Sequence, residues 1–120
     1  MSDRESIRFF SDGQRLDGEL WHPPSSACSA VVIACSGYLG LKGLQPARFA
    51  RALVPHGYAC LCFDYRGFGA SDGTPDEQGL YADAEASWRH LTDSLHVPPS
   101  RIVIFGHSLG GAIAIELAAQ

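Results

Sequence analysis

The segment from Ile102 to Ile115 constrains the fold of this chain more than any other part of it. It begins with a run of β-branched and aromatic residues, passes through a Gly-x-Ser-x-Gly pattern at residues 106–110, and continues into an Ala- and Ile-rich run that favours a helix. A strand, a tight turn and a helix in this order form the context in which the serine of such a motif acts as a nucleophile. The segment therefore predicts a strand–turn–helix unit with Ser108 at the turn.

The glycines of this motif have a steric role. Gly106 and Gly110 flank the serine because a Cβ at either position would block the close approach of strand to helix. A serine hydroxyl is a poor nucleophile until a base removes its proton. The motif therefore requires a histidine as that base and an acidic residue that orients the histidine. His107 does not suit that task, because neighbouring side chains diverge on so sharp a turn. The competing interpretation is a glycine-bearing turn that contains a serine by chance.

Composition excludes several classes of protein. The chain has 120 residues, enough for one domain, and its 46% hydrophobic and 18% charged residues are typical of a globular protein. A net charge of −4, with Lys42 as the only lysine, gives no footprint for nucleic acid or for an anionic membrane. No apolar run approaches the length of a membrane span, and no signal-peptide core follows the polar residues 1–5. We therefore expect a cytoplasmic location.

The four cysteines are expected to be free thiols. Cys35, Cys60 and Cys62 fall inside apolar strand patterns, where a buried thiol behaves as a small hydrophobe, and Cys28 precedes them in a loop. A reducing compartment fits this placement better than a set of disulfides. The sequence has no Cys-x-x-Cys pair and no His/Cys cluster with metal-ligand spacing, so we expect no metal and no cofactor.

The first half of the chain is predicted to start with a hairpin. Residues 5–21 hold an apolar, aromatic run before the turn dipeptide Asp12-Gly13 and a segment of alternating residues after it. A Pro/Ser loop leads to residues 30–35, which are apolar without alternation, the mark of a strand covered on both faces. A helix is predicted to begin near Pro46 and to end at Pro55-His56-Gly57. The residues expected on its buried side are Phe49, Ala50, Ala52 and Leu53.

A second passage of strand, helix and strand follows. Residues 58–64 are predicted to form another buried strand, and the glycine-rich loop 66–73 comes directly after it. The sequence Thr74-Pro75-Asp76-Glu77 is typical of a helix start, and two prolines break the chain before the strand 101–105. The helical stripe expected to face the sheet consists of Leu80, Ala84, Trp88, Leu91 and Leu95.

This alternation predicts an α/β fold, with an antiparallel N-terminal hairpin followed by parallel strands that carry helices on both faces. Active sites of such sheets lie at the carboxyl ends of the strands. Three glycine-bearing loops are expected there, at residues 36–40, 66–73 and 106–110. The sequence therefore predicts one site built from three loops.

The three loops resemble those of the α/β-hydrolase superfamily, and the resemblance covers nearly the whole chain. Ser36-Gly37-Tyr38 follows the first buried strand, where this family places an oxyanion-hole loop, although the family often has His-Gly there. Residues 64–71 are similar to its Asp-x-Arg-Gly-x-Gly-x-Ser loop, and residues 106–111 to its nucleophile elbow. The chain looks most like the serine aminopeptidase, monoacylglycerol lipase and dienelactone-hydrolase-like branches, which the sequence does not separate.

The resemblance implies a role for each loop. Ser108 is the expected nucleophile, on a strained backbone with positive φ. The expected oxyanion hole consists of the N–H groups of Leu109, at the head of the last helix, and of Tyr38, with Leu39 as a weaker alternative to Tyr38. The residues expected to support the site structurally are Gly37, Asp64, Arg66, Gly67, Gly106 and Gly110.

The expected function is hydrolysis of an ester, thioester, lactone or amide of a small acyl substrate. A serine at position 108 argues against haloalkane dehalogenases and epoxide hydrolases, whose elbows carry an aspartate. Asp64 precedes the serine, whereas this fold supplies its acid and then its histidine after it. The other histidines, at positions 22, 56, 90 and 96, fall in loops or on helix surfaces.

We therefore expect residues 1–120 to be the N-terminal part of a single hydrolase domain with an incomplete sheet, and to be inactive alone. The alternatives are a non-catalytic pseudo-hydrolase fragment, a short protein that pairs with another chain, and an acyltransferase that uses the same serine. The sequence does not predict an oligomeric state.

Overall fold

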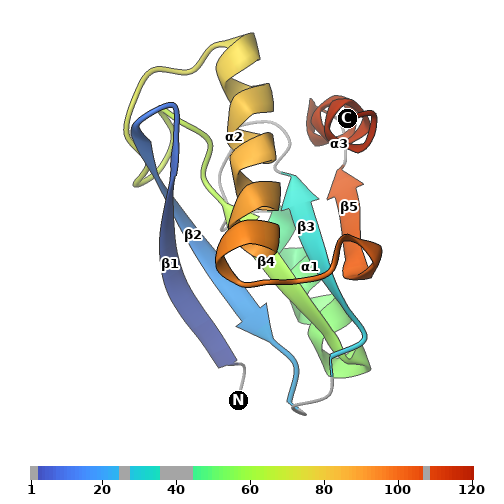
Figure 1. Cartoon of the computed structure of the whole chain (residues 1–120). Coiled ribbons are helices and arrows are strands. Elements are labelled where there is room, and N and C mark those ends of the chain that lie inside the picture. The colour runs from blue at the N-terminus through green and yellow to red at the C-terminus, as the bar shows by residue number, and fades with distance from the viewer. Residues whose placement is uncertain (1–2, 25–27, 36–44, 107–108) are drawn as a thin grey trace.

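Five strands form one mixed sheet in the part of the chain that the computed structural model describes, residues 3–24, 28–35, 45–106 and 109–120 (Figure 1). Their order across the sheet is β1-β2-β4-β3-β5. The strands are β1 (Asp3–Ser11), β2 (Gln14–His22), β3 (Ala30–Cys35), β4 (Tyr58–Phe63) and β5 (Ile102–Gly106). The helices are α1 (Gln45–Leu53), α2 (Glu77–Arg89) and α3 (Leu109–Ala118).

The predicted hairpin is confirmed. β1 and β2 pair in antiparallel register from Asp3 opposite His22 to Ser11 opposite Gln14. The turn dipeptide has φ of 49° at Asp12 and 77° at Gly13, the left-handed geometry that suits a two-residue hairpin loop. β2 then pairs antiparallel with β4, while β3 pairs parallel with both β4 and β5. β4 is therefore the strand that joins the hairpin to the parallel part of the sheet.

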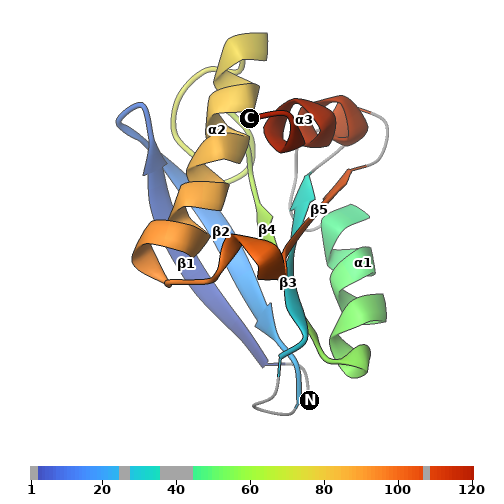
Figure 2. The same cartoon turned by 45° about the vertical axis from the view of Figure 1, so that its right-hand side comes forward.

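Helices cover both faces of the sheet, as predicted. α1 packs on β3 and β4 from one side, whereas α2 and α3 lie together on the other side (Figure 2). Consecutive residues of β4 serve the two layers in turn: Leu61 and Phe63 lie in the core under α2 and α3, and Cys60 and Cys62 in the core under α1. Burial on both faces explains why the strand sequences are apolar without alternation.

The prediction for the buried side of α1 is wrong at one residue. Ala50 is fully buried, and Phe49 and Leu53 are partly buried, but Ala52 is exposed. Ala52 is two positions from Ala50 and so lies far round the helix from it. The predicted helix end is confirmed, because a short 3₁₀ turn, Val54–His56, ends at Gly57 with φ of 93°.

The helix start predicted at Thr74-Pro75-Asp76-Glu77 is confirmed, but the stripe of α2 ends earlier than predicted. The Asp76 carboxylate accepts a hydrogen bond of 2.7 Å from the main-chain N–H of Gly79 and caps the helix. Leu80, Ala84, Trp88 and Leu91 pack in the core as expected, whereas Leu95 is 43% exposed. A π-helical turn over His90–Ser94 holds more residues than an α-turn, so the α-helical spacing no longer places Leu95 on the buried face.

The two edge strands of the described sheet differ in character. The exposed residues of β1 include Arg4, Glu5 and Arg8, charges that discourage pairing with another strand. β5 carries no charged residue, and its Val103 is 49% exposed. None of the helices in the described ranges is long and apolar enough to cross a membrane.

Candidate functional site

The predicted loops leave the same edge of the sheet, since β3, β4 and β5 run parallel. The last residues of β3 and β5, Cys35 and Gly106, are register partners. β5 ends at Gly106 and α3 begins at Leu109, so only His107 and Ser108 connect the strand to the helix. The carboxyl ends of β3 and β5, after which two of the three predicted loops follow in the sequence, therefore lie side by side.

Gly106 makes the close backbone contact that the motif predicts. A Cβ added there would lie 2.0 Å from the carbonyl oxygen of Gly110 and 2.8 Å from the nitrogen of Gly111. Both atoms belong to the backbone of α3, which cannot rotate away as a side chain could. Strand and helix therefore meet at a distance that requires glycine at position 106.

Several predicted site residues lie outside the described residues: Gly37, Tyr38, Leu39 and Ser108. The expectations that attach to them, a positive φ at Ser108 and two convergent N–H groups beside its hydroxyl, remain predictions. Leu109 is the first residue of α3, as the proposed donor at a helix N-terminus requires. Gly110 is buried in the first turn of the same helix.

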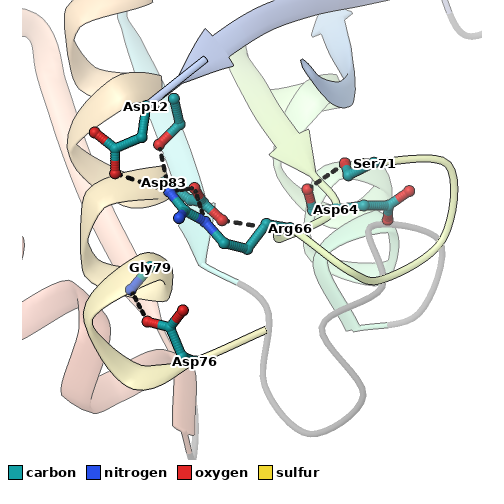
Figure 3. A network of polar contacts seen from close by, with 8 residues as sticks. Asp12, Asp64, Arg66, Ser71, Asp76, Gly79 and Asp83 are labelled. Carbon is teal, nitrogen blue, oxygen red and sulfur yellow. Dashed lines mark hydrogen bonds and ion pairs between the residues drawn. The ribbon is translucent and has the colours of Figure 1, made fainter. Parts of the chain in front are cut away.

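The loop after β4 folds back on Asp64. The Asp64 main-chain N–H donates to the carbonyl of Asp17 on β2 at 2.9 Å, and its carbonyl accepts from the Ser71 hydroxyl at 2.6 Å (Figure 3). Its carboxylate accepts from the Ala70 N–H at 3.3 Å. Gly69, with φ of 53°, passes so close that a Cβ there would lie 2.3 Å from the carboxylate. Asp64 is buried, with 2% of the residue exposed.

Arg66 extends from this loop to α2. Its Nε and Nη2 atoms donate to one carboxylate oxygen of Asp83 at 3.0 and 2.9 Å, and its main-chain N–H donates to the other at 2.8 Å. Nη2 also reaches Asp12 and Ser11 at the hairpin turn, both at 3.1 Å (Figure 3). The hydrogen bond to Asp83 is the largest cause that raises the pKa of Arg66. One guanidinium thus joins the β4 loop, the hairpin and α2.

Two residues of α2 that the sequence analysis did not single out complete this arrangement. Asp83 is fully buried, so its charge depends on Arg66 for compensation. Gly79, one turn earlier, leaves room for the arginine, because a Cβ there would lie 2.6 Å from Cδ of Arg66. The sequence does carry one signal for Asp83, which directly precedes Ala84 of the apolar stripe. A carboxylate so close to the buried face of a helix suggests a charged partner, because buried carboxylates are rare unless paired.

The cysteines and two of the histidines contact other parts of the fold and do not form a second site in the described residues. None of the four cysteines forms a disulfide, and burial raises the pKa of Cys35 to about 12 and that of Cys60 to about 11, which leaves both thiols protonated. His22 contacts Glu5 at 3.1 Å, and His90 stacks on Phe9 at 5.4 Å. Within the described ranges, no three His, Cys, Asp or Glu side chains are grouped as metal ligands would be.

Comparison with known proteins identifies relatives of this sheet and its loops. An uncharacterized protein of Mycobacterium tuberculosis is 43% identical over 117 residues, which are 98% of this chain and 41% of that protein. The quorum-quenching protein AidA of Acinetobacter baumannii is 31% identical, over 95% of this chain and 39% of AidA. A crystal structure of an alpha-beta hydrolase from Vibrio vulnificus matches with a TM-score of 0.86 and 30% identity, over 96% of this chain and 39% of the other.

These relatives are longer than the chain, which spans about two fifths of their length. Residues 30–120, from β3 to the end of α3, match the family model described as the alpha/beta hydrolase fold. Both the contact at Gly106 and the loop after β4 lie within this range. The chain therefore belongs to the alpha/beta hydrolase fold family.

Proposed function

We propose that the whole protein carrying this chain is a serine hydrolase in which Ser108 attacks the carbonyl carbon of a small acyl substrate. The observation that carries the proposal is the contact between Gly106 and the Gly110 carbonyl, because it brings the end of β5 against the start of α3 with only two residues between them. Such a turn is the setting that a nucleophile elbow needs.

The proposed oxyanion hole stabilises the charge that attack creates. Negative charge develops on the substrate carbonyl oxygen, and the main-chain N–H groups of Leu109 and Tyr38 are its proposed donors. Leu109 begins a helix of ten residues, whose first N–H groups have no partner within the helix and whose dipole favours an anion. Loss of one such donor raises the barrier by about 3 kcal/mol.

Asp64, Arg66 and Gly67 are proposed to shape the site and not to react, and Gly37 is proposed to shape the loop after β3. The Nε and Nη2 atoms of Arg66 are engaged by Asp83, Asp12 and Ser11, which ties these two nitrogens to the fold. Gly67 has φ of 79°, and a Cβ there would lie 2.2 Å from the ring of Pro75, so only glycine fits this point of the loop.

The proposed substrate is an ester, thioester, lactone or amide. The cytoplasmic location of the protein remains a separate prediction. In this fold the triad histidine follows the serine in the chain, and residues 109–120 contain none. We therefore propose that the acid and the histidine of the triad are contributed from outside these 120 residues. Acyl transfer to an acceptor other than water would use the same serine and the same oxyanion hole.

The test uses the protein expressed from its whole reading frame. Ser108→Ala should abolish hydrolysis of p-nitrophenyl acetate, and a fluorophosphonate probe should label the unsubstituted protein at Ser108 alone. Ser94→Ala, at an exposed serine of the π-helical turn, is the control and should keep full activity and labelling. Labelling at another residue, or full activity after Ser108→Ala, would refute the assignment.

Expression of residues 1–120 alone gives a second test. Because a serine without its base retains little activity, this polypeptide should turn over the ester no faster than its own Ser108→Ala variant. Activity that depends on Ser108 in this polypeptide would show that the base lies within these residues, contrary to the proposal.

A further inference from the structure

An aromatic contact joins α1 to the end of β5. Phe49 lies in the middle of α1, and Phe105 is the residue of β5 that directly precedes Gly106. Their rings meet at a centroid distance of 4.3 Å and an interplanar angle of 66°, an edge-to-face arrangement. No other ring contact in the described residues has so short a centroid distance. The side chain before the glycine therefore has a defined partner in the helix layer.

This contact extends beyond the two strands on which α1 packs. α1 packs on β3 and β4, whereas β5 lies on the far side of β3. Phe105 is partly buried against the core under α1, so the Phe49 ring meets it across the width of β3. In the described sheet β5 is an edge strand that pairs with β3 alone. A strand that is hydrogen-bonded along one edge depends more on side-chain contacts to hold its end in place.

The end of β5 is held from both faces of the sheet. On the face of α2 and α3, the backbone of α3 touches Gly106, which has no side chain with which to anchor the strand (Figure 2). On the face of α1, the Phe49 ring holds Phe105. A misplacement of about 1 Å reduces a rate by as much as about a hundredfold when reacting groups must align. The two contacts therefore act at a strand end whose position matters for the proposed reaction.

We propose that Phe49 and Phe105 form a positioning pair, in which the Phe49 ring holds the end of the strand that precedes Ser108 at a fixed distance from α1. α1 begins at Gln45, after the segment of the sequence that contains Tyr38. The pair thus sets the spacing between the segment of the proposed oxyanion donor and that of the proposed nucleophile. The proposal rests on the function proposed for Ser108 and assigns no chemical step to either ring.

Four variants of the whole protein test the pair: Phe49→Leu, Phe105→Leu, their double variant and Phe49→Tyr. The Tm is measured for each, and kcat and KM for p-nitrophenyl acetate and the rate of labelling by a fluorophosphonate are measured at a temperature where all are folded. Phe49→Leu should lower kcat and the labelling rate by about tenfold and leave KM unchanged, because the edge-to-face contact is lost. Phe105→Leu should have the same effect and the double variant no larger one. Phe49→Tyr keeps the ring and should keep kcat within about twofold.

Phe9→Leu is the matched control. Phe9 packs edge-on against Phe63 at a centroid distance of 5.6 Å, in the core under α2 and α3, where it joins β1 to β4. Loss of this ring should lower the Tm, because it leaves a cavity, and should keep kcat within about twofold of the unsubstituted protein, because neither strand is β5. A fall in kcat that is as large in Phe9→Leu as in Phe49→Leu would overturn the proposal.

The two proposals fail in different ways. If Ser108→Ala keeps its activity, the proposed function fails. If Ser108→Ala is inactive while Phe49→Leu keeps full kcat, or if the effects of Phe49→Leu and Phe105→Leu multiply in the double variant, the positioning pair fails and the function stands. Should Phe105→Leu not fold, Phe49→Leu and Phe49→Tyr decide between the outcomes, since equal kcat in these two would overturn the pair.

Discussion

The loop after β4 and the junction between β5 and α3 lie at the same end of the sheet but are held in place by opposite means. The β4 loop is fixed by polar and charged groups, above all by Arg66, which is bound to α2 and to the hairpin turn. The start of α3 lies against the end of β5 because Gly106 has no side chain, which lets two backbones touch. We call the hydrogen-bonded group of Arg66, Asp83, Asp12 and Ser11 the polar lock. The polar lock depends on the charge and hydrogen-bonding groups of its residues, whereas the contact at Gly106 depends on side-chain size. Substitutions at the two places should therefore change the stability of the protein for different reasons.

The largest effect is expected at the steric contact. Gly106→Val would place its side chain against the Gly110 carbonyl, where a Cβ already has only 2.0 Å, and should destabilise the protein by more than about 4 kcal/mol. Urea unfolding of the whole protein measures this. Gly111→Ala, in the helix that Gly106 contacts, is the matched control, because its Cβ would lie 3.7 Å from the Gly106 carbonyl oxygen; it should be neutral or stabilising by up to about 1 kcal/mol. Equal stability of the two variants would contradict the steric account.

The next effect is expected at the centre of the polar lock. Asp83→Ala leaves the Arg66 guanidinium, whose side chain is only 11% exposed, without its main partner and should cost about 3 kcal/mol. Replacement of both members by apolar residues, Asp83→Leu with Arg66→Met, should recover most of that loss, since it removes the unpaired charge. Thermal unfolding compares the three proteins. A double variant less stable than Asp83→Ala would show that the arginine contributes through contacts other than this ion pair.

A smaller effect is expected at the start of α2. Asp76→Ala removes the cap on the Gly79 N–H and should cost about 1 kcal/mol, while Asp76→Asn should retain most of the stability. Neither change touches Arg66, so ester hydrolysis by the folded protein should be unchanged. Loss of activity in Asp76→Ala at temperatures where it remains folded would mean that the helix start, and not only the ion pair, shapes the site.

The smallest effect is expected at the exposed member of the lock. The Asp12 side chain is 68% exposed, and its ion pair with Arg66 is screened by water and salt. Asp12→Asn should change the free energy of unfolding by less than about 0.5 kcal/mol, and by less again in 0.5 M salt. A loss as large as that of Asp83→Ala would place the centre of the lock at the hairpin.

The same contrast explains how much could be predicted from the sequence. The strands at residues 30–35 and 58–63, the second predicted one residue longer, and the helix start at residues 74–77 follow from local patterns. The Gly106 contact follows from a motif whose glycines have one steric purpose. The ion-pair partner of Arg66 could not be predicted from the residues near it in the sequence. Asp83 is 17 positions away, and the pairing depends on how α2 crosses the end of β4.

The wrong predictions have a related cause. Leu95 continues an α-helical spacing that the π-turn at His90–Ser94 interrupts, and no residue type in that turn signals the change. Ala52 is predicted on the buried side of α1 together with Ala50, but residues two positions apart lie on opposite sides of a helix, and Ala52 is exposed. Residue types predict which elements form more reliably than they predict which residues of a helix face the core.

The place of β4 between β2 and β3 has a consequence for the order in which the chain can fold. The hairpin of β1 and β2 needs only local contacts and can form within microseconds, but in the described sheet it reaches the parallel strands only through β4. β3 is made before β4 and cannot pair with it until synthesis has passed Phe63. As the chain leaves the ribosome, β3 is therefore an apolar segment without its first partner, and the time needed to synthesise the chain through β4 sets how long it stays exposed, since closing the connection is far faster.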